Sequence, residues 1–241
     1  MATGRGRRPT VTVVSIYRAI ATDLDGTLLG SDGRISERTR VAVLGAEDAG
    51  LAVVIATGRP PRWIAPIVDQ LGDRGLVVCA NGAAVYDPSR HELVRRTELT
   101  PEVLVEVGDD LAEAFPQAIF GVEQGFDFAI DEAIRDTTVE VRGSWNLDGL
   151  QIGPIRSYLD RPALKLIVRL PPPAPAGTAD AVQSVIGARG LVTHSVDESF
   201  LEVSHPRVHK AAAVEELLFD SGIVAHEVVA DPVVDEEDLL G

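Results

Sequence analysis

The sequence is poor in cysteine, in positive charge and in long hydrophobic runs. Cys79 is the only cysteine in 241 residues, which excludes an intrachain disulfide and a cysteine-rich zinc site and is typical of a reducing cytoplasm. No apolar run approaches the length of a membrane span. With 22 Lys and Arg against 37 Asp and Glu, the formal net charge of −15 disfavours binding to nucleic acid or to an anionic membrane. It would also repel phosphorylated substrates, so a phosphate site would need a local cation.

The N-terminal residues imitate a secretory signal. Three arginines among residues 5–8 precede an apolar run, and Ala19-Ile20-Ala21 imitates a cleavage site. Tyr17 and Arg18 interrupt the apolar part, however, and cleavage there would remove the strand that precedes the acidic motif described below. We therefore expect a cytoplasmic protein in which residues 1–10 form a disordered tail.

The overall composition is typical of a globular protein. The chain is 45% apolar and 24% charged, and 241 residues can form one large domain or two small ones around a sizeable core.

The most informative stretch is an apolar run, residues 11–21, that leads into two carboxylates, Asp23 and Asp25, and then Gly26 and Thr27. This pattern predicts a buried strand that stops at a polar turn. In an open α/β sheet, ligands bind outside the carboxyl ends of the strands, where both carboxylates would lie. Two carboxylates this close repel each other unless a cation lies between them, and oxygen ligands favour a hard cation such as Mg²⁺. One carboxylate could then attack phosphorus while the other exchanges protons with the leaving oxygen and with water.

The first part of the chain alternates between buried strands and helices. Ser36 is a good helix N-cap and Gly50 a good helix end. Apolar residues at helical spacing from Trp63 to Leu71 predict a second helix, and short apolar runs predict strands over residues 51–56 and 76–80. This order predicts a doubly wound parallel α/β sheet.

The pattern changes to short strands near Ala84. Residues 84–86 and 92–96 look like antiparallel strands, and more short strands, two helices and a proline-rich loop follow. We interpret residues 86–195 as an inserted α+β domain, and residues 11–85 and 196–241 as the parallel core. In the returning part, residues 200–203 lead back to the core, a helix begins near Lys210, and residues 228–230 form a last buried strand.

Residues 23–28, Asp-Leu-Asp-Gly-Thr-Leu, resemble motif I, D-x-D-G-T-L, of the haloacid dehalogenase (HAD) superfamily. The resemblance implies an α/β core with an inserted α+β cap. It also implies a Mg²⁺-dependent phosphatase in which Asp23 is the nucleophile and Asp25 the general acid and base.

Two further stretches carry the resemblance. Residues 54–59, Val-Ile-Ala-Thr-Gly-Arg, resemble HAD motif II, in which a short hydroxyl at a strand end holds a phosphoryl oxygen. Thr57 would supply that hydroxyl, although a threonine there also suits a helix cap. Asn81-Gly82-Ala83 resembles a stretch common in the Cof-type branch, whose C2-type cap lies between motifs II and III, and it also suits a hairpin turn.

The resemblance also implies a phosphate-binding set. Lys210 stands where the branch has its motif III lysine and could neutralise the paired aspartates and the phosphoryl charge, although a lysine at a helix start is more often solvated. The substrate-binding residues implied by family likeness are Thr57, Gly58, Asn81 and Lys210. Arg59 could contact substrate or pack at the mouth of the site, and is left out of the catalytic set.

The fourth motif departs from the family. The Cof-type pattern runs approximately A-F-G-D-x-x-N-D-x-x-M-L, and Asp231 and Asp235 keep the spacing of its two aspartates. The Phe-Gly pair is absent, Val234 replaces the asparagine, and the sequence stops at Gly241. The aspartates could complete a metal site with Asp23 and Asp25, or the likeness could be accidental in an acidic tail. A missing further strand would expose a sheet edge, which favours a homodimer or aggregation.

The function implied by the resemblance is the hydrolysis of a small phosphomonoester, a phosphorylated metabolite similar to a sugar phosphate. Two alternatives stay open. The first is a catalytically impaired HAD-like protein that binds a ligand or partner, since the fourth motif is incomplete. The second is a phosphomutase, which would use the same aspartate chemistry and which the large inserted cap disfavours.

Overall fold

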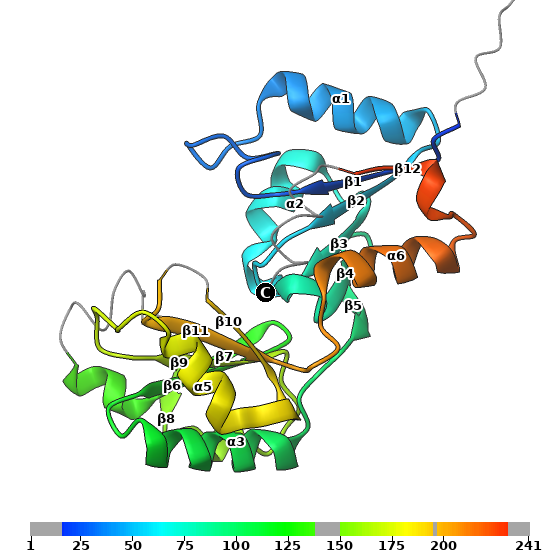
Figure 1. Ribbon diagram of the computed structural model, residues 1–241. Coiled ribbons are helices and arrows are strands. Elements are labelled where there is room, and N and C mark those ends of the chain that lie inside the picture. The colour runs from blue at the N-terminus through cyan, green and yellow to red at the C-terminus, as the bar shows by residue number, and fades with distance from the viewer. Residues whose placement is uncertain (1–15, 138–149, 195–196, 231–241) are drawn as a thin grey trace, which may run out of the picture.

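The computed structural model describes residues 16–137, 150–194 and 197–230. Its strands form two six-stranded sheets that lie one above the other in Figure 1. The predicted tail, residues 1–10, and the two acidic residues Asp231 and Asp235 lie outside the described residues.

The first sheet contains β1 (Ala19–Asp23), β2 (Ala52–Ala56), β3 (Leu76–Cys79), β4 (Ala84–Asp87), β5 (Glu92–Arg96) and β12 (Val228–Ala230). Their order is β12-β1-β2-β3-β4-β5. The first four strands of this order run parallel, and β4 and β5 pair antiparallel beside β3. The predicted α/β class with a parallel sheet is therefore confirmed.

Helices cover both faces of the first sheet because its central strands are apolar on both sides. The helical elements of this half are α1 (Glu37–Asp48), η1 (Pro61–Trp63), α2 (Ala65–Leu71), η2 (Ala80–Gly82), α6 (Lys210–Asp220) and η6 (Ala225–Glu227). On one face Ile55 and Val77 pack with Ile67 of α2. On the other face Val54 and Val78 pack against α6. The central strands are thus packed on both faces.

The second sheet contains β6 (Ile119–Gln124), β7 (Asp127–Asp131), β8 (Gln151–Gly153), β9 (Lys165–Arg169), β10 (Leu191–His194) and β11 (Phe200–Ser204), in the order β10-β11-β9-β6-β7-β8. Its helical elements are α3 (Pro101–Ala114), η3 (Glu132–Asp136), η4 (Ile155–Tyr158), α5 (Thr178–Ile186) and η5 (Gly187–Arg189). The apolar faces of α3 and α5 pack on one side of this sheet. Helix α3 lies on the side away from the first sheet (Figure 1). On the opposite face a second apolar cluster packs Ile119 and Ile167 with Ile134 of η3.

Two strand assignments made from the sequence are wrong. Strand β11 was expected to lead back into the core, but it pairs with β9 and β10 inside the second sheet. Strand β5 and the end of β4 fall in the range 86–195 predicted for the cap, but they extend the first sheet. Both errors arise because short alternating strands fit either sheet, and only long-range pairing decides between them. The division into a core and a cap remains a prediction, with boundaries nearer residues 97 and 205.

Among the residues that the structure describes, no helix is long and apolar enough to cross a membrane. Strand β12 lies at the edge of the first sheet, where Val229 is 43% exposed. The homodimer expected at such an edge stays a prediction.

The single cysteine provides a probe of the first sheet. Cys79 is fully buried at the end of β3, and burial raises the pKa of its thiol. We expect a disulfide reagent to modify it at least about 10³-fold more slowly in the native protein than in denatured chain, since a core strand must open first. The measurement is thiol titration, with guanidinium-denatured protein as the control. Native-state reaction at the denatured rate would show that β3 is open to solvent.

Candidate functional site

The carboxyl end of β1 carries the first site residue. Asp23 is the last residue of this strand and is 8% exposed, and Leu24 after it is fully buried. Because β1, β2 and β3 are parallel, the residues that follow each strand meet at one edge of the sheet. Asp23, Thr57 and the turn after β3 therefore lie at the same edge.

A cation approaches Asp23 from the start of α6. The Lys210 Nζ atom lies 3.6 Å from Asp23 Oδ1, and the two side chains are 12% and 11% exposed. Backbone packing fixes this approach, because Gly82 of η2 has φ +102° and lies directly against the residue before Lys210. A Cβ atom on Gly82 would be 2.6 Å from the carbonyl oxygen of His209. The close contact of η2 and α6 thus sets where Lys210 begins its helix.

Burial dominates the electrostatics of Asp23. Loss of solvent raises the pKa of its carboxyl, and the Lys210 charge opposes that rise. The negative charge of Asp25 raises the Asp23 pKa further. Burial and the Asp25 charge therefore disfavour the ionised form of Asp23, and positive charge nearby favours it.

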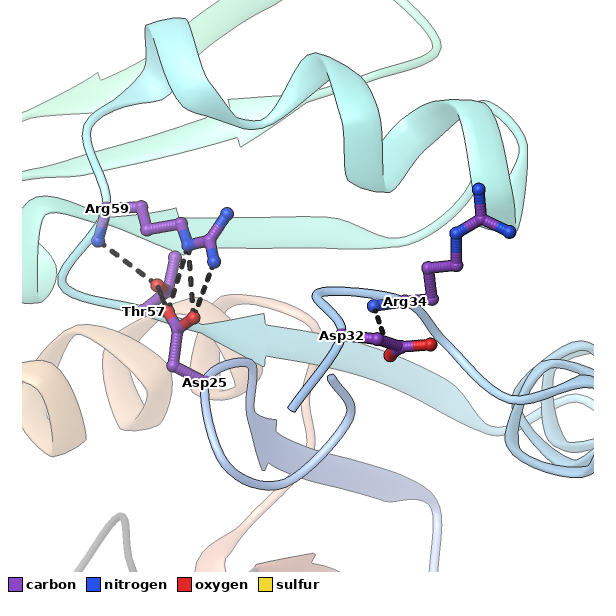
Figure 2. A network of polar contacts seen from close by, with 5 residues as sticks. All are labelled: Asp25, Asp32, Arg34, Thr57 and Arg59. Carbon is purple, nitrogen blue, oxygen red and sulfur yellow. Dashed lines mark hydrogen bonds and ion pairs between the residues drawn. The ribbon is translucent and has the colours of Figure 1, made fainter. Parts of the chain in front are cut away.

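Asp25 is held by motif II residues rather than by Lys210 (Figure 2). Arg59 donates to both of its oxygens, with Nη2 at 2.6 Å from Oδ1 and Nε at 3.0 Å from Oδ2. The Thr57 hydroxyl donates to Asp25 Oδ2 at 3.4 Å and accepts from the backbone N–H of Arg59 at 3.1 Å. The Asp25 side chain is 51% exposed, so a substrate can still reach it.

The loop after β2 is tied to its neighbours through the backbone. Thr57 donates its N–H to Val78 at 2.8 Å and its carbonyl accepts from Asn81 at 3.1 Å. Gly58 fits under the amide of Asn81, whose Oδ1 would lie 2.9 Å from a Cβ there. Asn81 belongs to η2, which connects the antiparallel strands β3 and β4, so the hairpin interpretation of this stretch also holds.

The sequence-predicted residues fall into three groups. Asp23 meets Lys210, Asp25 meets Thr57, and Asn81 packs on Gly58. Figure 2 also shows a separate contact, in which the backbone N–H of Arg34 donates to the Asp32 carboxylate. Asp231 and Asp235 lie outside the described residues.

Sequence reasoning left Arg59 outside the catalytic set, and the structure gives it a defined partner in Asp25. The sequence signal for Arg59 was its position two residues after Thr57, beyond the carboxyl end of a predicted parallel strand. That signal does not distinguish a substrate contact from packing, because the side chain is long enough for either.

The donors at this edge are hard oxygens, the type of ligand that Mg²⁺ takes. In residues 16–137, 150–194 and 197–230, no three His, Cys, Asp or Glu side chains gather as a metal site. Mg²⁺ commonly keeps several waters and one or two carboxylate ligands, so a site based on Asp23 fits its chemistry.

Known proteins resemble this chain in part of their sequence. The chain is 36% identical over 92 residues to the HMP-PP phosphatase of Serratia proteamaculans, a match over 38% of this chain and 33% of the relative. It is 39% identical over 79 residues to the 5-amino-6-(5-phospho-D-ribitylamino)uracil phosphatase YcsE of Bacillus subtilis, over 33% of this chain and 31% of the relative. The matches thus span about a third of the length of these curated relatives.

The fold extends the likeness over almost the whole chain. The HAD-superfamily phosphatase BT1666 of Bacteroides thetaiotaomicron superposes with a TM-score of 0.74 at 18% identity, covering 94% of this chain and 80% of that one. The sequence profile of the haloacid dehalogenase-like hydrolases matches residues 20–230, which includes Asp23, motif II and α6. The chain belongs to the haloacid dehalogenase-like hydrolase family.

Proposed function

We propose that this protein is a Mg²⁺-dependent phosphatase that hydrolyses a small phosphomonoester through an aspartyl-phosphate on Asp23. The observation that carries the proposal is the buried pair of Asp23 and Lys210, with 3.6 Å between Oδ1 and Nζ. Ligands of open α/β sheets bind outside the carboxyl ends of the strands, and Asp23 lies at the end of β1. Family membership supplies the reaction class.

In the first half of the reaction, an Asp23 carboxylate oxygen forms a bond to phosphorus and the ester P–O bond breaks. The leaving oxygen takes a proton from the Asp25 carboxyl. Asp25 suits this role because it lies two residues from Asp23 and its side chain is half exposed. Arg59 and Thr57 orient its carboxyl group.

In the second half, a water molecule attacks the phosphorus of the aspartyl-phosphate and gives a proton to the Asp25 carboxylate. The bond between Asp23 and phosphorus breaks, which releases inorganic phosphate and restores both carboxyl groups. The Lys210 ammonium stabilises the phosphoryl oxygens in both halves. The Thr57 hydroxyl and the Gly58 and Asn81 turn would hold the remaining phosphoryl oxygens.

Mg²⁺ bound at this edge would neutralise phosphoryl charge in a protein of net charge −15. The Asp23 carboxylate and the Asp25 backbone carbonyl are its proposed ligands, with Asp231 and Asp235 as the further candidates from the acidic segment after β12. The proposed location is the cytoplasm, in keeping with the single buried thiol.

The test is phosphate release from a panel of phosphate esters with Mg²⁺, run beside the Asp23→Asn variant. The panel includes sugar phosphates, HMP-PP and 5-amino-6-(5-phospho-D-ribitylamino)uracil, since relatives are named for the last two. We expect at least one compound to be hydrolysed by the wild type and not by the variant. If no compound is hydrolysed faster than by Asp23→Asn while ligands still bind, the chain is the catalytically impaired binder instead.

A further inference from the structure

Four alternating charges lie between the two sheets, outside the site described above. Arg62 comes from the first half of the chain, and Glu123, Lys165 and Glu202 come from β6, β9 and β11 of the second sheet. Lys165 is 2% exposed and the Glu123 side chain 5%. We call these four residues the interface network. Charges this deeply buried need partners, so each contact has a large effect on the arrangement.

One half of the interface network is an arginine–carboxylate pair. Arg62 Nη2 lies 2.7 Å from Glu123 Oε1, and Arg62 Nε lies 3.0 Å from Oε2. The guanidinium also lies over the rings of Trp63 and Phe128, at 4.4 and 4.6 Å from their centroids. This half joins η1 to the second sheet but makes no contact with the motif II loop among the contacts described here.

The other half reaches the site itself. The Lys165 ammonium pairs with the carboxylate of Glu202 and donates to the carbonyl oxygen of Gly58 at 3.3 Å. Gly58 lies between Thr57 and Arg59, the two residues that hold the Asp25 carboxyl. A side chain of the second sheet is therefore bonded to the peptide at the centre of the motif II loop.

The three carbonyl groups of this loop, from Thr57 to Arg59, have different donors. The N–H groups of Asn81 and Ala80 donate to the carbonyls of Thr57 and Arg59, at 3.1 and 2.9 Å, and hold the loop to η2. The Gly58 carbonyl has Lys165 as its donor. Glu202 keeps the ammonium in place because the pair is nearly closed to water, at 2% and 13% exposure. Losing the lysine would remove this donor from the partly buried Gly58 carbonyl.

We propose that Lys165 is a positioning residue for the phosphatase reaction: through the Gly58 carbonyl it fixes the loop that orients Asp25. This inference rests on the proposed function for its kinetic consequence and on the geometry alone for its structural one. If Lys165 has this role, the orientation of Asp25 depends on the contact between the second sheet and the motif II loop. The rival explanation is that Lys165 only holds the two sheets together, as the pair of Arg62 and Glu123 does.

The experiment compares two double variants that each remove one positive and one negative charge from the interface network. Lys165→Met with Glu202→Gln removes the half that bonds Gly58, and Arg62→Met with Glu123→Gln removes the other half and is the matched control. A third variant, Lys165→Gln, keeps a polar group beside Glu202 in case the first double variant folds poorly. The readouts are amide hydrogen exchange of the metal-free proteins, and kcat and KM with the best ester of the panel.

We expect exchange at the amides of Arg59, Ala80 and Asn81 to speed up by about 10- to 100-fold in the two Lys165 variants, the size expected when a hydrogen bond to a charged group is lost. In the same variants kcat should fall by about tenfold or more with KM changed by less than about threefold, since orientation and not binding is lost. The matched control should leave these three amides protected.

The proposal is overturned if the three amides stay protected without Lys165, or if the matched control exposes them equally. A wild-type protein that releases no phosphate would instead end the proposed function, while the exchange data would still decide whether Lys165 holds the loop.

Discussion

Replacing Asp23 by asparagine is expected to reduce phosphate release by at least about 10³-fold, because removal of a catalytic nucleophile costs this much or more. The substitution changes one buried oxygen to nitrogen at the end of β1 and creates no cavity. The measurement is kcat/KM of the purified variant with the best ester and Mg²⁺.

The control for this prediction is folding. Burial raises the Asp23 pKa, so its carboxyl contributes stability below its unfolded pKa, near 3.8, and that contribution is lost as pH rises through the folded pKa. At neutral pH burial disfavours the ionised carboxyl, but Asp23→Asn also takes the partner charge from Lys210. These effects oppose each other, so metal-free Asp23→Asn should unfold at about the same temperature as wild type. Activity that survives in Asp23→Asn would contradict the aspartyl-phosphate mechanism, and a clear loss of thermal stability would contradict the electrostatic account.

Gly82→Ala is expected to damage both stability and catalysis without touching substrate. A Cβ there would lie 2.6 Å from the carbonyl oxygen of His209 and 3.1 Å from the Cβ of Ala213, and φ +102° is unfavourable for alanine. Left-handed strain and overpacking together should cost about 3 kcal/mol. The start of α6 must move to relieve the contact, which carries Lys210 away from Asp23. Misplacement of about 1 Å at a site lowers rates by about 10²-fold.

The matched control is Gly222→Ala at the other end of α6. Gly222 also has a positive φ, +69°, but nothing lies within 4 Å of a Cβ built on it. This variant should lose only about 1 kcal/mol and keep its kcat. The measurements are denaturant unfolding and kcat for both variants. Equal effects of the two substitutions would show that the contact between Gly82 and His209 does not position Lys210.

Much of the site could be predicted from sequence because its residues stand beside strongly patterned elements. Asp23 and Thr57 each end an apolar strand, and parallel strands bring their carboxyl ends to one edge. Lys210 was predicted from its likeness to the motif III lysine of the family, and it lies at the start of α6, 3.6 Å from Asp23. The pairing of Asp25 with Arg59 could not be predicted, because a half-exposed arginine can reach several partners.

Trp63 and β11 show where local pattern fails. Trp63 fits the helical spacing of its apolar neighbours, but it lies in η1 before α2 and is 48% exposed. Residues 200–204 alternate as any strand does, and their place between β9 and β10 depends on segments up to 40 residues away. Such pairings are decided by which partners bury the most apolar surface.

The sequence by itself determined the α/β class, through the order of its strands and helices, and the family, through its motifs. The roles of the site residues stay predictions. Only the tertiary structure decided that Lys165 and Glu123, ordinary charges on short strands, are buried between two sheets. It also decided that one of them bonds the motif II loop at Gly58. The physical reason is that burial of a charge depends on what packs over it, and here the covering surface comes from the first half of the chain, more than 60 residues earlier.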